Sequence, residues 1–452
     1  MRPRIASFLA PFLMLACSDV TAPAPESPPS ASSQVAPQQG ASSVASHSAP
    51  TASSSAKPDA PAIAPKPEEI DAAKRFAKAN NAFGFDIYNE IRSTPGNLAM
   101  SPTSLSIALA MTWAGAKGNT ASEMRKVLHF ESSPADVMND SATLTKLLEN
   151  PSRGLTLSLA NRLFGEKTYT FEKPYLDSTE KAFGASLEAV DFMKETEKAR
   201  ATINQWVEQK TEKRIVDLVP SGTLDKDTRL VLVNAVYFAA DWQRPFDKNT
   251  TQPEDFTVSA SSKVRAEMMR QTGTFKYGES NGTKLIEIPY KGGEMSMLIA
   301  LPSDTNDIAK LEASLGADKL AEWQSAMKNE RVALWMPKFE INPAKSTKLN
   351  DALKTLGMKS AFERKKADFT GIANPPSPDE QLMVSYVFHK AFVKVDEKGT
   401  EAAAASSVSL AAKGAAARPT ELKIDRPFVY FIRDEKTGLV LFMGRVSDPT
   451  AK

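Results

Sequence analysis

The side chains that usually carry enzymatic chemistry are sparse in this sequence. It has three histidines, His47, His129 and His389, and a single cysteine, Cys17. Neither a G-x-S-x-G nucleophile motif nor an H-E-x-x-H metal motif occurs. One S-x-x-K match begins at Ser178, but its partner motifs are missing and so short a pattern is common by chance. We therefore expect no hydrolase chemistry, no metal centre and no cofactor.

The most unusual segment is a long run of small residues near the C-terminus. More than twenty residues separate two apolar runs, and they are mostly alanine and serine, with Lys413-Gly414 and Arg418-Pro419 towards the end. A loop of this length inside a compact domain is uncommon, and is usually functional or disordered. On composition alone, an unremarkable flexible loop remains an alternative.

Apolar patterning on both sides of the loop predicts the elements that hold it. Residues 428–432 and 439–443 predict a hairpin around a polar turn at 433–438. Residues 231–238 and 295–301 are short apolar runs with polar or proline flanks, which predict buried strands. Helical spacing of apolar residues from Ile70 to Ile91 predicts an opening helix, with a break or a continuation near Gly84.

Length and charge set further limits. The chain has 452 residues, of which 42% are hydrophobic and 24% charged, enough to bury a large core. Its 56 basic and 54 acidic residues leave a net charge of only +2, so we expect no nucleic-acid partner. With one cysteine, the domain has no internal disulfide and depends on packing.

The N-terminus predicts export. Residues 1–16 combine two arginines with an apolar stretch too short to span a bilayer, which is typical of a signal peptide. The end of this stretch, Leu13-Met14-Leu15-Ala16-Cys17, resembles the bacterial lipobox, in which the cysteine becomes lipidated. Met14 departs from the usual leucine, and an ordinary cleaved signal is the alternative.

Three regions follow from this organisation. Residues 1–16 form the signal peptide, and residues 17–67 begin with the lipid-attachment cysteine and continue as a disordered tether rich in Ala, Pro and Ser. Residues 68–452 form the folded domain. We expect secretion across the inner membrane and a lipid anchor at the cell surface or in the periplasm, with an extracellular protein as the alternative.

Ordered sequence blocks extend over about residues 70–452. The segment before the loop is Glu397-Lys398-Gly399-Thr400-Glu401, followed by Ala402, Ala403, Ala404 and Ala405. Other blocks are Ser101-Pro102-Thr103-Ser104, Leu232-Val233-Asn234-Ala235-Val236-Tyr237-Phe238 with Trp242, Asp368-Phe369-Thr370-Gly371-Ile372, His389-Lys390-Ala391 and Arg426-Pro427-Phe428. In this order the blocks resemble the serpin family of serine protease inhibitors, and the segment before the loop is similar to the hinge of inhibitory serpins. With its N-terminus, the chain resembles a bacterial, secreted, inhibitory member.

The resemblance implies a metastable α+β fold with three β-sheets, eight or nine helices and an exposed reactive-centre loop at about residues 397–422. It also implies a mechanism: a serine protease is acylated by the loop, which then inserts as a strand into the central sheet and traps the covalent acyl-enzyme. The partner is therefore the target serine protease, and we expect a monomer.

Family positions assign the remaining site residues. Lys413 lies sixteen residues after Glu397 and fourteen before Pro427, the spacing of the scissile residue, so Lys413-Gly414 is the expected reactive bond. A lysine there suits a trypsin-like target. Ser101, Ser104, Asn234 and His389 match the polar cluster called the shutter, and Trp242 matches the breach, where the loop first enters the sheet.

The loop composition suits insertion into a sheet. Residues 400–413 contain no proline, so no ladder hydrogen bond is lost. Alternate residues from Thr400 to Ala412 are uncharged, and Glu401 lies on the opposite face. An alanine run also favours helix, so the uncleaved loop is expected to be partly helical.

Alternatives remain open at this point. Leu410 and Arg418 are the other candidate bait residues. A non-inhibitory serpin with a binding or structural role is the alternative function, and an enzyme is the third class. The stretch expected to hold the heparin-binding helix of activated serpins has only Lys146 and Arg153 as basic residues, so we expect no heparin activation.

Overall fold

The computed structural model describes residues 65–150, 155–184, 187–377, 380–400 and 418–451. The chain divides into two units, and every described residue belongs to the second, Pro61–Lys452. Cys17, tether residues 17–64 and loop residues 401–417 lie outside the described residues, so the lipid attachment and the disorder of 17–64 stay predictions. The predicted tether is too long at its end, because Pro67 already begins helix α1 (Pro67–Ile91).

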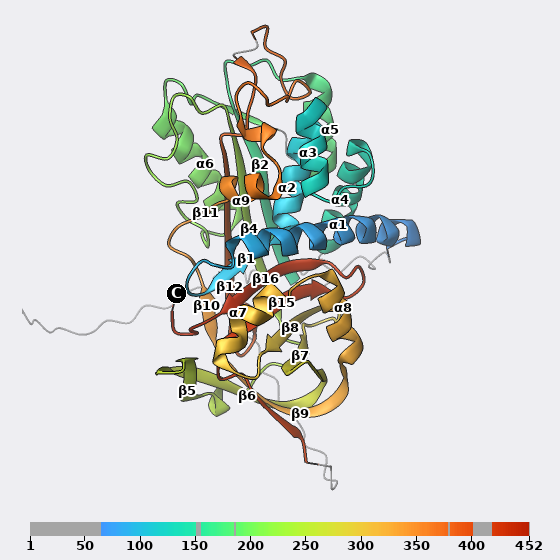
Figure 1. The fold of residues 1–452 in the computed structure, drawn as a ribbon, viewed down its shortest axis with the longest axis vertical. Coiled ribbons are helices and arrows are strands. Elements are labelled where there is room, and N and C mark those ends of the chain that lie inside the picture. The colour runs from blue at the N-terminus through green and yellow to red at the C-terminus, as the bar shows by residue number, and fades with distance from the viewer. Residues whose placement is uncertain (1–64, 151–154, 185–186, 378–379, 401–417, 452) are drawn as a thin grey trace, which may run out of the picture. The chain divides into compact units, whose positions relative to one another are not determined.

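Nine α-helices lie in the described ranges, within the expected eight or nine (Figure 1). Local capping explains several of their ends: Ser101 and Ser133 cap α2 and α4, and Gly184 ends α5 in the left-handed conformation. None of the described helices is both long and apolar enough to cross a membrane. The helices are α1 Pro67–Ile91, α2 Pro102–Ala114, α3 Gly118–Val127, α4 Pro134–Leu148, α5 Lys173–Phe183, α6 Thr196–Lys210, α7 Ile308–Ala313, α8 Ala317–Ala326 and α9 Asn350–Leu356.

The strands form two hydrogen-bonded sheets. The central sheet has the order β10-β12-β13-β4-β2-β3, with β11 on β12, and the second sheet has the order β1-β16-β15-β8-β7-β6-β9-β14, with β5 on β6. The strands are β1 Leu98–Met100, β2 Leu155–Glu166, β3 Glu188–Val190, β4 Leu230–Asp241, β5 Gln252–Ser259, β6 Ser262–Ser280, β7 Thr283–Pro289, β8 Met295–Leu301, β9 Lys328–Pro337, β10 Phe339–Ile341, β11 Thr347–Lys348, β12 Tyr386–Val395, β13 Gly399–Thr400, β14 Thr420–Lys423, β15 Phe428–Asp434 and β16 Val440–Val446.

The long strand β6 explains why the expected three sheets appear as two. Its first part pairs with β5 and β9, and its last residues, from Lys276, pair with β7. Strands β14, β9, β6 and β5 therefore form one group, and β6 through β1 form another, joined where β6 passes between them. With the central sheet these make three groups of strands, and the predicted α+β fold is confirmed.

The opening helix continues through Gly84 without a break. A Cβ at Gly84 would lie 2.7 Å from the Pro102 ring, so this glycine allows α1 and α2 to approach closely. The predicted strands at 231–238 and 295–301 are confirmed as parts of β4 and β8.

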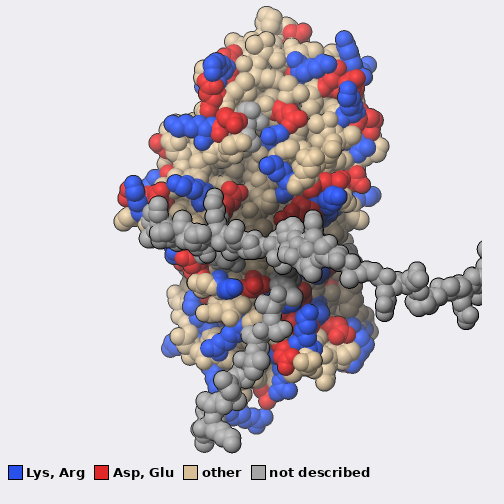
Figure 2. Space-filling view, turned by 180° about the vertical axis from the view of Figure 1, so that it is seen from behind, with Lys and Arg blue, Asp and Glu red and all other residues tan. Residues whose placement is uncertain are grey.

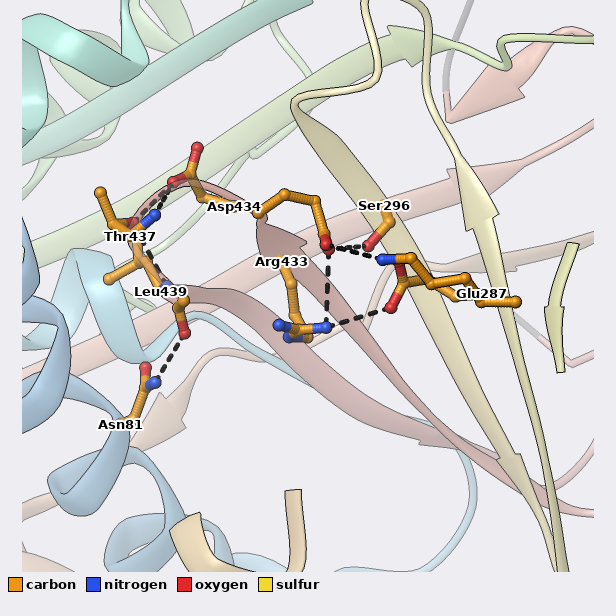
Figure 3. A network of polar contacts seen from close by, with 10 residues as sticks. Asn81, Glu287, Ser296, Arg433, Asp434, Thr437 and Leu439 are labelled. Carbon is orange, nitrogen blue, oxygen red and sulfur yellow. Dashed lines mark hydrogen bonds and ion pairs between the residues drawn. The ribbon is translucent and has the colours of Figure 1, made fainter. Parts of the chain in front are cut away.

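The predicted C-terminal hairpin is confirmed, with a shorter turn than expected because β15 continues to Asp434. The Asp434 carboxylate accepts hydrogen bonds from the Thr437 amide at 2.7 Å and hydroxyl at 2.6 Å, which fixes the turn. Asn81 of α1 binds the same turn: it donates to the Gly438 carbonyl at 2.8 Å and accepts from the Val440 amide at 2.9 Å (Figure 3).

A buried ionic cluster lies beside this hairpin. Arg433 is 1% exposed and points toward Glu287, with Nη1 3.3 Å from the Glu287 carboxylate (Figure 3). Lys276 contacts Glu287 at 2.7 Å and Glu435 at 3.1 Å, and Ser296 donates to Glu435 at 2.7 Å. Each buried charge thus has an opposite partner, which its burial requires.

A second buried ion pair joins α7 to β16. Arg445 Nη1 lies 2.8 Å from both carboxylate oxygens of Glu312, and Tyr88 of α1 donates to the same carboxylate at 2.6 Å. Arg445 also donates to the carbonyls of Thr94 and Gly96 in the connection after α1. The side chain thereby holds α1, α7 and β16 together.

Replacing Arg445 by Met should therefore destabilise the fold by about 3–5 kcal/mol, because Glu312 would stay buried without its cation. The free energy of the first transition in urea-induced unfolding, compared between variant and wild type, measures this loss. Lys310→Met, which breaks the exposed Lys310–Asp307 pair, is the matched control and should cost less than about 1 kcal/mol. Equal losses for both variants would contradict the assignment.

Candidate functional site at the seam of the central sheet

The site is the seam between β4 and β12 in the central sheet. These strands are parallel and directly paired, from Tyr386 beside Val231 to Phe392 beside Tyr237. At one end of the seam β13 lies between them, with Thr400 paired to Val395 of β12 and to Ala240 of β4. The seam is therefore closed along most of its length and parted at one end.

The two faces of the seam contact different cores. Leu230, Leu232, Val236 and Phe238 of β4 belong to the main core, which also contains α2 residues. The alternate β4 residues, Val231, Val233, Ala235 and Tyr237, belong to a smaller core with α6 residues (Figure 1). Any strand added at this seam must therefore match two buried surfaces.

The parted end is built around Trp242, the predicted breach residue. Trp242 is 1% exposed, and its ring stacks on Tyr290 at a centroid distance of 4.5 Å. Its indole N–H donates to the Asp396 carbonyl at 3.0 Å, and its backbone N–H donates to the Lys398 carbonyl at 2.7 Å. Tyr290 and Thr400 share a hydrogen bond of 2.6 Å between their hydroxyl groups. The turn that contains the hinge is thus held by hydrogen bonds at its start, at Asp396, and at its end, at Thr400.

Glu397, the first hinge residue, is a buried carboxylate with two side-chain partners. Lys338 Nζ lies 3.0 Å from its Oε2, and Thr251 donates to its Oε1 at 2.9 Å. Burial opposes ionisation, but the hydrogen bonds from its backbone, Lys338 and Thr251 outweigh burial and hold the pKa of Glu397 below its usual value. Glu397 therefore stays charged and anchors the start of the hinge.

Gly399 has a steric role in the same turn. A Cβ at this position would lie 2.0 Å from the Ala240 carbonyl oxygen, so a larger residue would push β13 off β4. Glycine is thus required by close backbone approach.

The predicted shutter residues meet halfway along the seam. The Ser101 amide donates to His389 Nε2 at 3.1 Å, and His389 Nδ1 hydrogen-bonds the Asn234 side-chain oxygen. The Asn234 amide group donates to the Ser104 hydroxyl at 2.6 Å. Because Asn234 and His389 are paired across the seam, their hydrogen bond joins the two strands directly.

The network contains a fifth residue that the sequence analysis did not identify. Asn161 of β2 accepts hydrogen bonds from Asn234 at 2.7 Å and from Ser104 at 2.8 Å. It pairs with Asn234 in the sheet, so three polar side chains lie side by side across β2, β4 and β12. The sequence offered one sign of this role: an asparagine stands among the apolar residues of a buried strand.

His389 is neutral in this arrangement. Burial lowers its pKa from 6.5 to about 3, because nothing nearby compensates a desolvated charge. Nε2 accepts from a backbone amide, so the proton resides on Nδ1, which donates to Asn234. His389 therefore takes part in the network as a neutral hydrogen-bonding residue.

The structure thus places hinge residues Glu397, Gly399 and Thr400 at the breach, and the shutter farther along the same seam. Hinge residues Glu401, Ala402, Ala403, Ala404 and Ala405 and the reactive bond, Lys413 and Gly414, lie outside the described residues. Among the described residues, no group of His, Cys, Asp and Glu is arranged to hold a metal.

Charge is mixed on the face opposite to that of Figure 1. Figure 2 shows basic and acidic side chains interspersed there, with no broad area of one sign. The helix in the predicted heparin position is α4, whose only basic residue is Lys146, 4.0 Å from Glu69.

Known proteins match this chain over most of its length. Residues 78–449 match the family model "Serpin (serine protease inhibitor)". Among curated relatives, human Serpin B3 is 39% identical over 394 residues, which cover 83% of this chain and 99% of that protein. Human leukocyte elastase inhibitor is 37% identical over 386 residues, covering 83% of this chain and all of the relative.

Solved structures give the same fold. Serpin48 of the insect Tenebrio molitor matches with a TM-score of 0.74 and 31% identity, over 82% of this chain and 98% of that structure. Human thyroxine-binding globulin matches with a TM-score of 0.76 and 28% identity over 84% of this chain, and uncleaved ovalbumin with 0.74 and 27% over 83%. Both of these structures are covered completely.

The neutral His389 predicts a pH dependence. Since its folded pKa, about 3, is below the unfolded value of 6.5, its contribution is complete above pH 6.5 and is lost as pH falls towards 3. Between pH 7 and pH 5 the free energy of the first unfolding transition should fall by about 2 kcal/mol.

His389→Gln should remove this dependence, whereas His129→Gln, at an exposed histidine paired with Asp86, should keep it. Urea titrations at several pH values measure both. If the free energy of unfolding depends on pH in His389→Gln as it does in the wild type, groups other than His389 cause that dependence.

Proposed function

The chain belongs to the serpin family, and we propose that it is a suicide-substrate inhibitor of trypsin-like serine endopeptidases, cleaved between Lys413 and Gly414. The protease serine attacks the Lys413 carbonyl, the Gly414 amine leaves, and an ester joins the two proteins. The freed loop then inserts between β4 and β12 before water hydrolyses that ester. The parted end of the seam is the observation that carries this proposal.

The register of β13 supports insertion without sliding of the neighbouring strands. Along the closed seam His389 pairs with Asn234, and the same register continued would pair Val395 with Ala240. Those two residues instead flank Thr400. β12 and β4 therefore need only separate sideways to admit a strand.

Continuing the antiparallel register from Thr400 assigns a neighbour to each loop residue. Ala402 and Ala404 would lie beside Phe238 and Val236, so small residues meet large ones. Val408 and Leu410 would lie beside Leu232 and Leu230, which begins β4. All of these β4 residues face the main core, so the uncharged face of the loop meets that core.

Two polar positions of the loop also find neighbours. Ser406 would lie between Asn234 and His389, where its hydroxyl can replace the hydrogen bond that the parting of the seam breaks. Glu401 would lie on the other face beside Lys394, forming a cross-strand pair of opposite charge. If about ten ladder hydrogen bonds form at about 1 kcal/mol each, insertion gains on the order of 10 kcal/mol.

The same register favours Lys413 over Leu410 and Arg418 as the residue before the cleaved bond. A strand that fills the seam ends near Leu410, and cleavage after Lys413 leaves enough chain to reach that end. Cleavage after Leu410 would leave no residues to connect the strand to the protease. Arg418 lies just before β14 and is followed by Pro419, so the bond after Arg418 is a tertiary amide to a proline nitrogen, which trypsin-like proteases cleave poorly.

The alternative is a non-inhibitory serpin with a binding or structural role. The fold alone does not distinguish an inhibitory serpin from a non-inhibitory one, since the solved structures with this fold include thyroxine-binding globulin complexed with thyroxine. The hinge sequence supports the inhibitory function: Gly399, Thr400 and the alanines after Glu401 carry no bulk, charge or proline that would stop insertion. In the proposed register Glu401 itself would lie on the opposite face.

We also propose that Cys17 carries a lipid anchor and that the tether holds the domain away from a bacterial membrane. The apolar stretch before this only cysteine of the chain supports export and lipidation. Metabolic labelling with a radioactive fatty acid would test this, with Cys17→Ser as the variant that should lose the label.

For the reactive bond, we predict that trypsin forms an SDS-stable complex with the wild type and with Lys413→Arg, but not with Lys413→Ala. The charge at this position must enter the acidic specificity pocket of the protease. Gel electrophoresis detects the complex, and mass spectrometry of the released peptide places the cleavage. A stable trypsin complex with Lys413→Ala would refute Lys413 as the scissile residue.

For insertion, we predict that Ala404→Glu turns the inhibitor into a substrate. Glutamate would have to enter the main core beside Val236, so insertion stalls and the ester hydrolyses. The moles of inhibitor consumed per mole of trypsin should rise by about tenfold or more.

Ala416→Glu is the matched control, because in the proposed mechanism it lies beyond the cleaved bond and does not insert. Neither variant adds a lysine or arginine that trypsin could cleave, so both should be cleaved after Lys413. Full inhibition by Ala404→Glu would exclude the proposed register.

A further inference from the structure

A cavity of about 430 Å³ lies beside β14, away from the seam. Its walls come from four strands and the turn after β14. Residues of β7, β8 and β9 meet β14 there: Lys284, Leu301, Trp335, Leu422, Lys423 and Arg426 line it. The cavity is large enough for a small aromatic molecule.

Trp335 gives the cavity an aromatic wall. It is only partly buried, although it is the central residue of three paired strands, with Arg270 of β6 on one side and Lys423 of β14 on the other. The Arg270 guanidinium lies 4.7 Å from the centre of the indole ring. Trp335 is therefore held in place by a cation while part of its surface stays accessible.

The charges around the cavity leave one cation without a partner. Its acidic residues are neutralised, Glu421 by Arg418 at 3.3 Å and Asp425 by Arg426 at 2.8 Å. Lys423 is paired with Glu254. Among the described residues, Lys284 makes no side-chain hydrogen bond or ion pair, and it lines the cavity.

Arg426 adds a second donor. Its Nε donates to the Pro302 carbonyl at 2.8 Å and its Nη1 contacts Asp425, while Nη2 has no partner in the described part of the chain. Lys284 and Arg426 thus line the same cavity as Trp335, Leu301 and Leu422.

From this arrangement we propose that the cavity binds a small aromatic carboxylate. Its ring packs against Trp335 and the two leucines, and its carboxylate accepts hydrogen bonds from Lys284 and Arg426. This site goes beyond the inhibitory function and does not depend on it, since no part of it lies on the seam.

Binding there would also hold β14 in place. In the described part of the sheet β14 is an edge strand of four residues, Thr420–Lys423, paired only with β9. A ligand touching Leu422 of β14 and Lys284 of β7 bridges the edge strand to a part of the sheet with which it shares no hydrogen bonds. Opening of β14 should slow in proportion to occupancy.

The test titrates 2-naphthoate into the full-length protein by calorimetry, with the uncharged 2-naphthamide as the matched ligand. We expect naphthoate to bind at least about tenfold more tightly than the amide, and Lys284→Gln to remove that preference. Trp335→Leu should weaken both ligands. Lys328→Gln, an exposed lysine on β9 that does not line the cavity, should change neither.

Hydrogen exchange then locates the ligand. The amides of β14 should exchange more slowly with saturating naphthoate, and not in Lys284→Gln. Equal affinity for naphthoate and its amide, unchanged binding by Lys284→Gln, or unchanged exchange in β14 would each overturn the proposal.

Discussion

The central sheet depends on one contact that the proposed inhibition would have to break, the direct pairing of β4 with β12. The polar network and β13 both act on this seam. The hydrogen bond between Asn234 and His389 closes it halfway along, and β13 parts it at the breach. A buried polar network is a weak source of net stability but a strong determinant of one arrangement, because each unpaired group is costly. The shutter therefore specifies the closed state more than it strengthens it.

Stability elsewhere in the domain has a different source. The second sheet and α1 are held by a large apolar core and by buried ion pairs such as Arg445 with Glu312. The ion pair lies outside the seam, and the core extends well beyond the β4 and β12 residues that border it. Separation of the seam would therefore leave much of this stabilisation in place. The ion pair of Glu397 with Lys338 fits the same division, because it would hold the start of the hinge in place during the proposed insertion.

Much of this arrangement could be predicted from the sequence, and the failures have identifiable causes. Periodicity predicted the opening helix, β4, β8 and the final hairpin, and ordered motifs predicted Ser101, Ser104, Asn234, His389 and Trp242. Asn161 was missed because its role depends on the register of β2 with β4, which local pattern does not reveal. The ion pair of Lys338 with Glu397 was missed for the same reason, because the two residues lie 59 positions apart in the sequence. The fusion of two sheets through β6 was missed because one strand changes partners along its length.

The directions of the strands at the seam have a consequence of their own. β4 and β12 run the same way, and a parallel ladder has slanted hydrogen bonds that are slightly weaker per residue than those of an antiparallel one. β13 already runs against both neighbours. A full strand following it would replace one parallel ladder by two antiparallel ladders. Part of the energy of the proposed insertion would therefore come from chain polarity alone, and would survive replacement of most side chains along the seam.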